Sequence, residues 1–81
     1  MPADDVLSGV YAILNKRNRG LELQTDTLLG SGGMGLDSIA LVEVLLECED
    51  RFGIEVAAEA LAQSPLTVGS LVETILALLP S

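Results

Sequence analysis

Apolar residues recur at helical spacing in three segments of the chain, residues 4–19, 37–52 and 67–79. In the first segment the spacing gives one apolar stripe, made of Val6, Leu7, Val10, Ile13 and Leu14. The stripe of the last segment consists of Val68, Leu71, Val72, Ile75 and Leu79. A single stripe per segment is typical of helices that pack one face on a shared core. The pattern therefore predicts three main helices.

Residues at the segment boundaries are those that begin and end helices. Asp37 and Thr67 are of the types that cap helix N-termini, because their side-chain oxygens accept from free backbone N–H groups. Gly53 follows the second segment and Pro80 follows the third, where both residue types commonly stop helices. The second helix is therefore expected to begin at residue 37 or 38 and to end near residue 52.

A basic cluster closes the first segment. Lys16, Arg17 and Arg19 lie where cations interact favourably with the C-terminal end of a helix dipole. Gly20 comes next and suits a helix C-cap. We therefore interpret the cluster as residues that stabilise the C-terminal end of the helix, which is expected to run to residue 19.

Residues 20–36 are expected to form a long first loop, because glycines at four positions exclude regular structure: Gly30, Gly32, Gly33 and Gly35. No Gly-Lys-Ser/Thr follows them, so a phosphate-binding P-loop is rejected. Some of the four leucines in this segment are expected to dock the loop on the helices: Leu21, Leu23, Leu28 and Leu29. A further short helix is expected over residues 57–62. The predicted fold is all-α: a small four-helix bundle of three main helices and one short helix, in a single domain covering residues 1–81.

The second helix carries two apolar groups. At about 100° per residue, a conventional core stripe contains Leu41, Leu45, Cys48 and Phe52. A second group on another part of the wheel contains Ile39, Val42 and Leu46, and it is surrounded by Glu43, Glu49 and Asp50. An apolar group rimmed by carboxylates is typical of a docking surface. The alternative is a central helix with both groups buried.

Charge and residue usage narrow the function. The chain has 81 residues and a net charge of −8, so nucleic acid and anionic membranes are unlikely partners, and a basic protein surface suits it better. Its one cysteine permits no internal disulfide or cysteine metal cluster, and Cys48 is expected to be a buried hydrophobe. We see no secretory signal and no membrane-length apolar stretch, and we expect a cytoplasmic protein.

Residues 35–39 (Gly-Leu-Asp-Ser-Ile) join the glycine-rich loop to the second helix. With Asp37 as the cap, Ser38 lies in the first turn with a surface hydroxyl, where helix amides favour a bound phosphate. An ordinary capped helix start is the alternative interpretation. The chain has no histidine, so Ser38 lacks the usual base of a hydrolytic nucleophile.

Residues 35–39, followed by Val42-Glu43, Leu46 and residues 49–54, resemble the acyl carrier protein family, as does Leu66-Thr67-Val68 before the last helix. The resemblance covers essentially the whole chain. It implies that a phosphopantetheinyl transferase attaches 4′-phosphopantetheine from coenzyme A to Ser38, with Asp37 as its motif neighbour. It also implies apolar docking positions at Ile39, Val42 and Leu46 and acidic recognition positions at Glu43, Glu49 and Asp50.

The resemblance further implies a carrier rather than an enzyme, a monomer that holds an acyl or aminoacyl thioester and presents it to enzymes with basic docking surfaces. Ile39 stands where the motif usually has leucine, and the glycine-rich stretch is longer than usual. These departures favour a specialised lipid, polyketide or related pathway over housekeeping fatty-acid synthesis. A peptidyl carrier and a non-covalent acidic interaction module are the alternatives.

Overall fold

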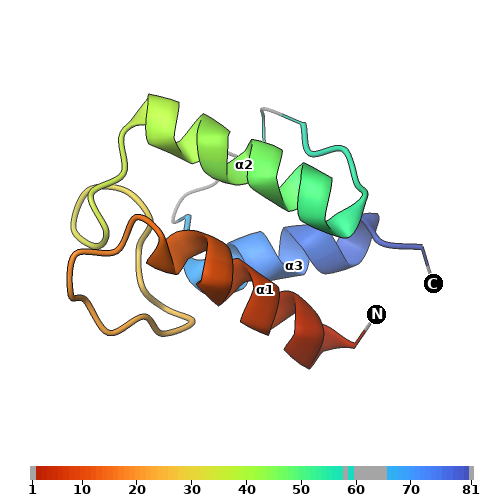
Figure 1. Ribbon diagram of the computed structural model, residues 1–81, viewed down its shortest axis with the longest axis horizontal. Helices are drawn as coiled ribbons and strands as arrows, with labels where there is room; N and C mark the ends of the chain where they lie inside the picture. The colour runs from red at the N-terminus through yellow and green to blue at the C-terminus, as the bar shows by residue number, and fades with distance from the viewer. Residues whose placement is uncertain (1, 58, 60–65, 81) are drawn as a thin grey trace.

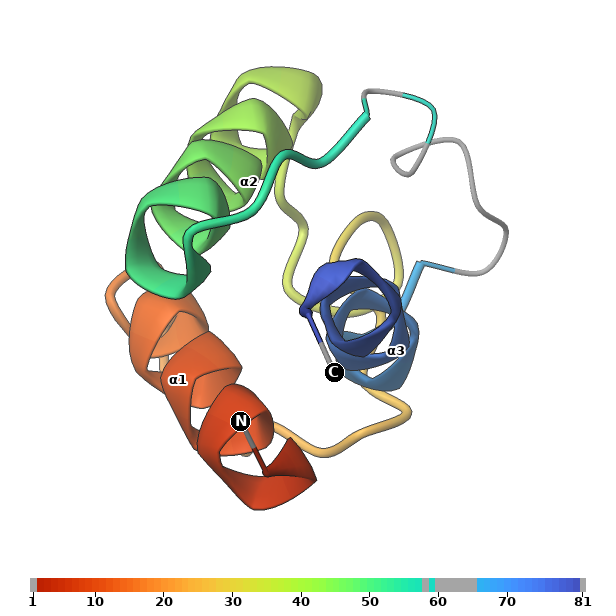
Figure 2. The same ribbon diagram turned by 90° about the vertical axis from the view of Figure 1, so that its right-hand side faces the viewer.

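The fold is built from three helices, seen in a computed structural model that describes residues 2–57, 59 and 66–80. They are α1 (Ala3–Asn15), α2 (Ser38–Phe52) and α3 (Val68–Leu78). α1 and α2 lie on one side of α3, and the long loop joins them at the end of the molecule opposite the two termini (Figures 1 and 2). The described residues contain no strand, only an isolated bridge between Leu28 and Thr67, so the all-helical prediction is confirmed. The short helix predicted over residues 57–62 falls mostly outside the described residues and stays a prediction.

One aliphatic core lies between the helices. α1 contributes five buried residues and α3 four, and these include most of the apolar stripes predicted for both segments. From α2 the buried residues are Val44, Leu45, Cys48 and Phe52. Leu79, predicted in the last stripe, lies just beyond α3 and is only partly buried. The chain therefore forms its core from the faces that the helical spacing selects.

α1 ends four residues earlier than predicted. Asn15 is its last residue, and Arg17 and Asn18 donate backbone hydrogen bonds to carbonyls three residues back, as in a tightening last turn. The Asn18 side chain then bonds both the N–H and the carbonyl of Leu21, which gives the backbone an alternative to the helix. The prediction that Lys16, Arg17 and Arg19 occupy the last helical turn, with Gly20 as the cap, is therefore wrong.

The first loop is tied to the start of α3. Leu29 is buried and its N–H bonds the carbonyl of Leu66, while Val68 donates its N–H to Thr27. Thr67 caps α3 in a capping box with Ser70, as each side chain accepts from the other's backbone N–H. Some of the four loop leucines dock as expected: Leu29 is buried and Leu23 packs against the core, whereas Leu21 is exposed. The loop is therefore part of the packed structure.

Candidate functional site

The start of α2 is held by its cap. Asp37 has an extended backbone, and its Oδ1 accepts from the N–H of Ala40 at 2.8 Å. Its carbonyl accepts from the N–H of Leu41 at 2.9 Å, which begins the helical bonding. The prediction of Asp37 as the N-cap is confirmed, and Ser38 becomes the first helical residue.

The glycine-rich loop fixes the approach to this cap. Met34 donates its N–H to Leu28, and Leu36 donates to Leu29, so the loop folds back on itself. At Gly33 any Cβ would overlap the carbonyl oxygen of Leu28. Gly35 has φ +73°, which L side chains rarely adopt. The glycines thus permit a close-packed turn that leads directly to Ser38.

Ser38 presents its hydroxyl to solvent. The residue is exposed, and its Oγ makes no hydrogen bond within the part of the chain that the structure describes. A serine with an unengaged oxygen at a rigid helix start can be approached by an enzyme without unfolding. Its position therefore fits covalent modification.

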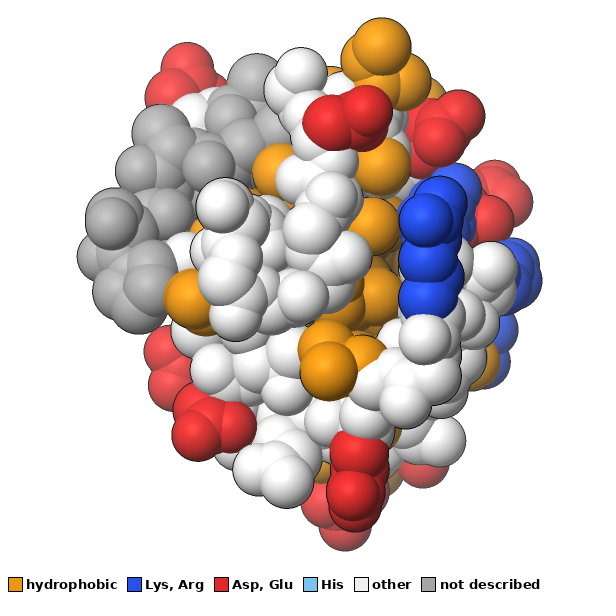
Figure 3. Space-filling view, turned by 90° about the vertical axis from the view of Figure 1, so that its left-hand side faces the viewer, with side chains coloured by type: hydrophobic (Ala, Val, Ile, Leu, Met, Phe, Trp, Pro, Cys, Tyr) orange, Lys and Arg blue, Asp and Glu red, His pale blue; other side chains and the backbone are white. Residues whose placement is uncertain are grey.

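The second apolar group of α2 lies on the surface. Ile39 is 72% exposed, Val42 45% and Leu46 57%. In Figure 3, which views the end of the molecule where the loop meets α2, apolar side chains lie beside carboxylates at the top, over α2. The alternative that both apolar groups of this helix are buried is therefore wrong. We call Ile39, Val42 and Leu46 the exposed apolar face.

The three acids predicted around this face differ in their surroundings. Asp50 is exposed and makes no ion pair with any described residue. Glu49 is half-buried, and its Oε2 accepts from the N–H of Val56 at 2.8 Å. Glu43 is exposed, and its Oε1 lies 3.7 Å from the Nη2 of Arg17. Of these three acids, only Asp50 has a carboxylate without a partner among the described residues.

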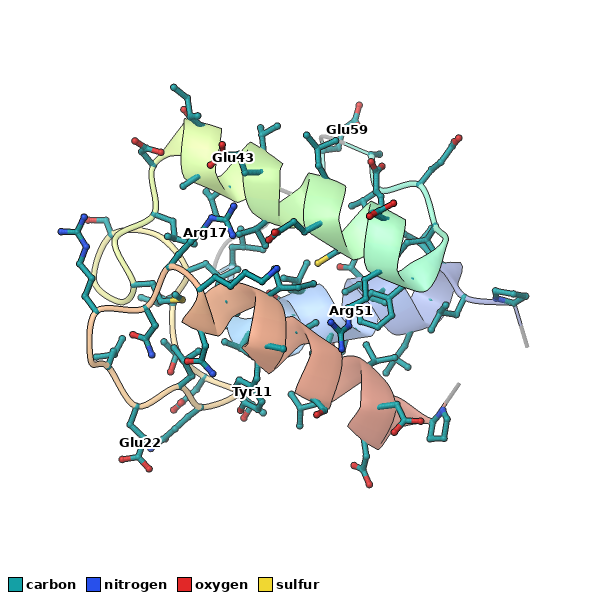
Figure 4. All side chains as sticks on the ribbon, in the orientation of Figure 1. Tyr11, Arg17, Glu22, Glu43, Arg51 and Glu59 are labelled. Atoms are coloured by element: carbon teal, nitrogen blue, oxygen red, sulfur yellow. The ribbon has the colours of Figure 1, made fainter. Side chains whose placement is uncertain are left out.

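A fourth acid, Glu47, joins α2 to the end of α1. Its Oε2 accepts from Arg17 at 2.8 Å and its Oε1 from Lys16 at 3.2 Å. Figure 4 shows Arg17 reaching from the end of α1 toward Glu43 on α2. The hydrogen bond from Arg17, helped by Lys16, lowers the pKa of the Glu47 carboxyl. The basic cluster therefore pairs with α2.

A family model described as a phosphopantetheine attachment site matches residues 18–75. This span is more than half of the chain. The chain belongs to this phosphopantetheine-attachment family. No curated protein and no solved structure is significantly similar to the chain. Domains of this family bind 4′-phosphopantetheine covalently and are generally carriers rather than catalysts, so the chain is a phosphopantetheine carrier domain.

The residues at the start of α2 fit this group. An attached phosphodiester needs an accessible hydroxyl, and Ser38 is exposed in the span that the family model matches. An open groove lies at the same end of α2, lined by Gly35, Asp37 and Ala40 among others. The described residues contain no group of three or more His, Cys, Asp or Glu side chains that could hold a metal ion. None of the described helices is long and apolar enough to cross a membrane.

Cys48 lies on the side of α2 that faces the core, away from the exposed apolar face. It is fully buried, as predicted. Burial, with smaller effects of Glu47 and Glu49, raises the pKa of its thiol to about 11. The thiolate is the reactive form of cysteine, so Cys48 is a packing residue of the carrier rather than a second attachment point.

The sequence predicted Asp37 as the cap, the exposed apolar face and the burial of Cys48, but it did not predict the ion pairs of Glu47. The only available signal was the position of Glu47 between the two apolar groups of the helix, which does not reveal a partner. Lys16 and Arg17 pair with Glu47 only because α1 and α2 pack together.

Proposed function

We propose that Ser38 carries the 4′-phosphopantetheine arm and that the protein holds an acyl or aminoacyl intermediate on it as a thioester. The observation that supports this assignment is the exposed hydroxyl of Ser38, which has no hydrogen-bond partner among the described residues and lies in an Asp-Ser motif at the start of a capped helix. The arm's terminal thiol supplies the thioester chemistry when it is bound. The protein itself supplies the anchor and the surface that partner enzymes recognise.

The attachment step uses the Ser38 oxygen as the nucleophile. Its Oγ forms a bond to the coenzyme A phosphorus next to pantetheine, the P–O bond to the second phosphate breaks, and adenosine 3′,5′-bisphosphate leaves. The Ser38 proton needs a base. The chain has no histidine, and the Asp37 carboxylate already accepts from the N–H of Ala40. The phosphopantetheinyl transferase is therefore expected to supply the base, and the carrier to have no turnover of its own.

Partner enzymes are proposed to dock on the exposed apolar face. Apolar contacts at the centre of an interface, with charges at its rim, match the ordinary anatomy of protein complexes. Glu43, Glu49 and Asp50 are proposed as the acidic recognition positions, facing basic side chains of the partner. Asp50 contributes most in this proposal, because Glu43 lies near Arg17 and Glu49 accepts from Val56.

The oligomeric state, compartment and pathway of this carrier are proposed from its resemblance to acyl carrier proteins. We expect a monomer in the cytoplasm that serves a specialised lipid, polyketide or related pathway. A peptidyl carrier is the alternative within the family. Loading the protein with matched acyl and aminoacyl coenzyme A derivatives, and comparing how fast purified partner enzymes consume each form, distinguishes the two.

The intact mass of the protein tests the attachment site. The natural chain is incubated with coenzyme A and a broad-specificity transferase, alongside Ser38→Ala and Ser31→Ala. Ser31 is a matched control, because it is an exposed serine in the adjoining loop. We expect a gain of one phosphopantetheinyl group in the natural chain and in Ser31→Ala, and none in Ser38→Ala. Loading of a folded Ser38→Ala variant would show that the assignment is wrong.

Charge variants test the docking surface. Asp50→Asn is expected to slow transferase loading at low salt, because rim charges mainly accelerate encounter. Glu22→Gln is the matched control: Glu22 is exposed and lies away from α2, at the opposite side of the molecule (Figure 4). Equal slowing by both variants would mean that overall charge, rather than this surface, governs recognition.

The exposed apolar face also supports a second candidate, a non-covalent interaction module, because such a face can bind a partner without an arm. This candidate predicts equal partner binding by the unmodified protein and by Ser38→Ala, and equal downstream function. Loss of function in Ser38→Ala with partner binding intact would contradict it.

A further inference from the structure

A groove runs beside the start of α2, and cations line one of its walls. Lys16, Arg17 and Arg19, from the segment after α1, line it together with residues at the start of α2, among them Asp37, Ala40 and Glu43. Figure 3 looks at this end of the molecule and shows a column of Lys and Arg side chains standing beside apolar ones. Three of the four cations of a chain with net charge −8 therefore line a groove at the start of α2, the end of the helix that carries Ser38.

These three cations are not equally available. Lys16 and Arg17 share the Glu47 carboxylate, and Arg17 also lies near Glu43. The side chain of Arg19 is exposed and has no hydrogen bond or ion pair with any residue in the described ranges. Arg19 is therefore the cation of the groove that can bind an added anion.

Hydrogen bonds of the Asn18 side chain hold the backbone on both sides of Arg19. Asn18 Nδ2 donates to the carbonyl of Leu21 at 2.6 Å, and Asn18 Oδ1 accepts from the Leu21 N–H at 3.0 Å. Asn18 Nδ2 also bonds Asn15 Oδ1 at 3.0 Å. These bonds close the turn that contains Arg19, so that its side chain starts from a fixed point on the groove wall. A fixed starting point lowers the entropy cost of binding.

We propose that this groove binds an anion carried on the arm, with Arg19 as the contact residue. The ligand is the phosphodiester at the root of the arm or a carboxylate on its cargo, since a guanidinium pairs with both. The inference rests on Ser38 as the attachment site. Asp37 and Ala40 line the groove and lie within one helical turn of Ser38, so the root of the arm and the groove share the same end of α2.

Because the anion is tethered to the protein through the arm, a weak contact with Arg19 is sufficient to bind it. An anion on a short flexible link has an effective concentration in the millimolar range. An interaction with a dissociation constant of about 1 mM is then occupied about half of the time, although the same anion free in dilute solution would hardly bind. Two carboxylates also line the groove, but Asp37 accepts from the N–H of Ala40 and Glu43 lies near Arg17. Negative charges beyond about 8 Å weaken the contact little, because salt screens them.

Nuclear magnetic resonance tests the proposal on the unmodified, phosphopantetheinylated, acetyl-loaded and malonyl-loaded protein. The amide signals of residues 16–20 are followed in the natural chain, in Arg19→Gln and in Arg51→Gln, and the Arg19 Nε–H signal in the two proteins that contain this arginine. Arg51 is the matched control, an exposed arginine at the far end of α2. Intact mass establishes the loading state of each sample.

A phosphodiester ligand is expected to shift these signals when the arm is attached, with no further change between acetyl and malonyl cargo. A carboxylate ligand is expected to shift them only with malonyl cargo. Either shift must be lost in Arg19→Gln and kept in Arg51→Gln. Fully loaded protein with no shift in any state, or with the same shift in Arg19→Gln, would overturn the inference and leave the attachment site intact. Failure of the natural chain to load would overturn the attachment site and this inference together.

Discussion

The two faces of α2 are built from similar residues in opposite surroundings. Leu45 is 7% exposed and packs in the core, while its neighbour Leu46 is 57% exposed. Both are leucines in one helix, so helix propensity does not distinguish them. The buried face is completed by α1 and α3, whereas nothing in the described structure covers the exposed apolar face. One face therefore contributes to folding, and the other remains available to a partner.

Alanine substitution at these two neighbours gives the largest expected contrast. Leu45→Ala should lower the free energy of unfolding by about 2–5 kcal/mol, because it removes packed methyl groups and leaves a cavity. Leu46→Ala should change it by less than about 0.5 kcal/mol, as is usual for surface positions. Chemical denaturation followed by circular dichroism measures both. Equal destabilisation would mean that the two faces are not distinct.

In partner recognition, by contrast, Leu46→Ala should have a larger effect than Leu45→Ala. A central interface residue commonly contributes more than about 1 kcal/mol, or roughly fivefold in a rate or affinity. Leu46→Ala should therefore slow transferase loading about fivefold or more under conditions where the natural chain stays folded. Saturating the transferase tests the cause, because a pure docking defect weakens when the enzyme is in excess.

The reactivity of the Cys48 thiol tests whether the buried face of α2 stays closed in the native protein. A pKa of about 11 instead of 9.0 lowers the thiolate fraction near neutral pH, by about a hundredfold. In the native protein we expect a thiol reagent at pH 8 to titrate no group without the arm and one group, the arm thiol, with it. One more thiol should react in each case after denaturation. Rapid native labelling at Cys48 would show that the buried face of α2 opens easily.

The loop before α2 allows a similar contrast between two glycines. A Cβ at Gly33 would overlap the carbonyl oxygen of Leu28, whereas a Cβ at Gly30 would lie 3.9 Å from the carbonyl oxygen of Leu36, an ordinary contact. Gly33→Ala should therefore cost about 1–3 kcal/mol of stability, and Gly30→Ala should cost little. Thermal unfolding measures the two. A neutral Gly33→Ala would mean that the loop does not need this close packing.

Local rules were sufficient to predict α2 and its two faces. Asp37 as the cap and Gly53 as the stop act through bonds within a few residues, so the chain around them specifies them. The helical period then assigns Leu45 to one face and Leu46 to the other. The exposed position of Ser38 follows from the same cap. The family resemblance added the chemistry, which the helical pattern does not contain.

The end of α1 and the ion pairs of Glu47 could not be predicted in this way. Residues 16–19 contain no glycine or proline that would stop a helix after Asn15, but the Asn18 side chain bonds Leu21 and favours a turn. Once that turn forms, Lys16 and Arg17 point toward a residue about thirty positions away, which becomes a neighbour only through packing of α1 on α2. A contact at such separation leaves no periodic signal in the sequence.

The smallest expected effect lies at the boundary of the two faces, where Glu47 accepts from Lys16 and Arg17. Glu47→Gln should lower stability near neutral pH by about 0.2–1 kcal/mol, since partly exposed pairs are screened. The pKa of Glu47 is lowered from its ordinary value of 4.5 by folding, so its contribution is complete above that value and is lost as the pH falls through the lowered pKa. The stability difference between the natural chain and Glu47→Gln should accordingly disappear in acid and shrink in high salt, whereas Glu22→Gln, at an exposed carboxylate away from α2, should show neither change. A difference that persists in acid would assign the role of Glu47 to packing, and the link between the basic cluster and α2 would then not depend on charge.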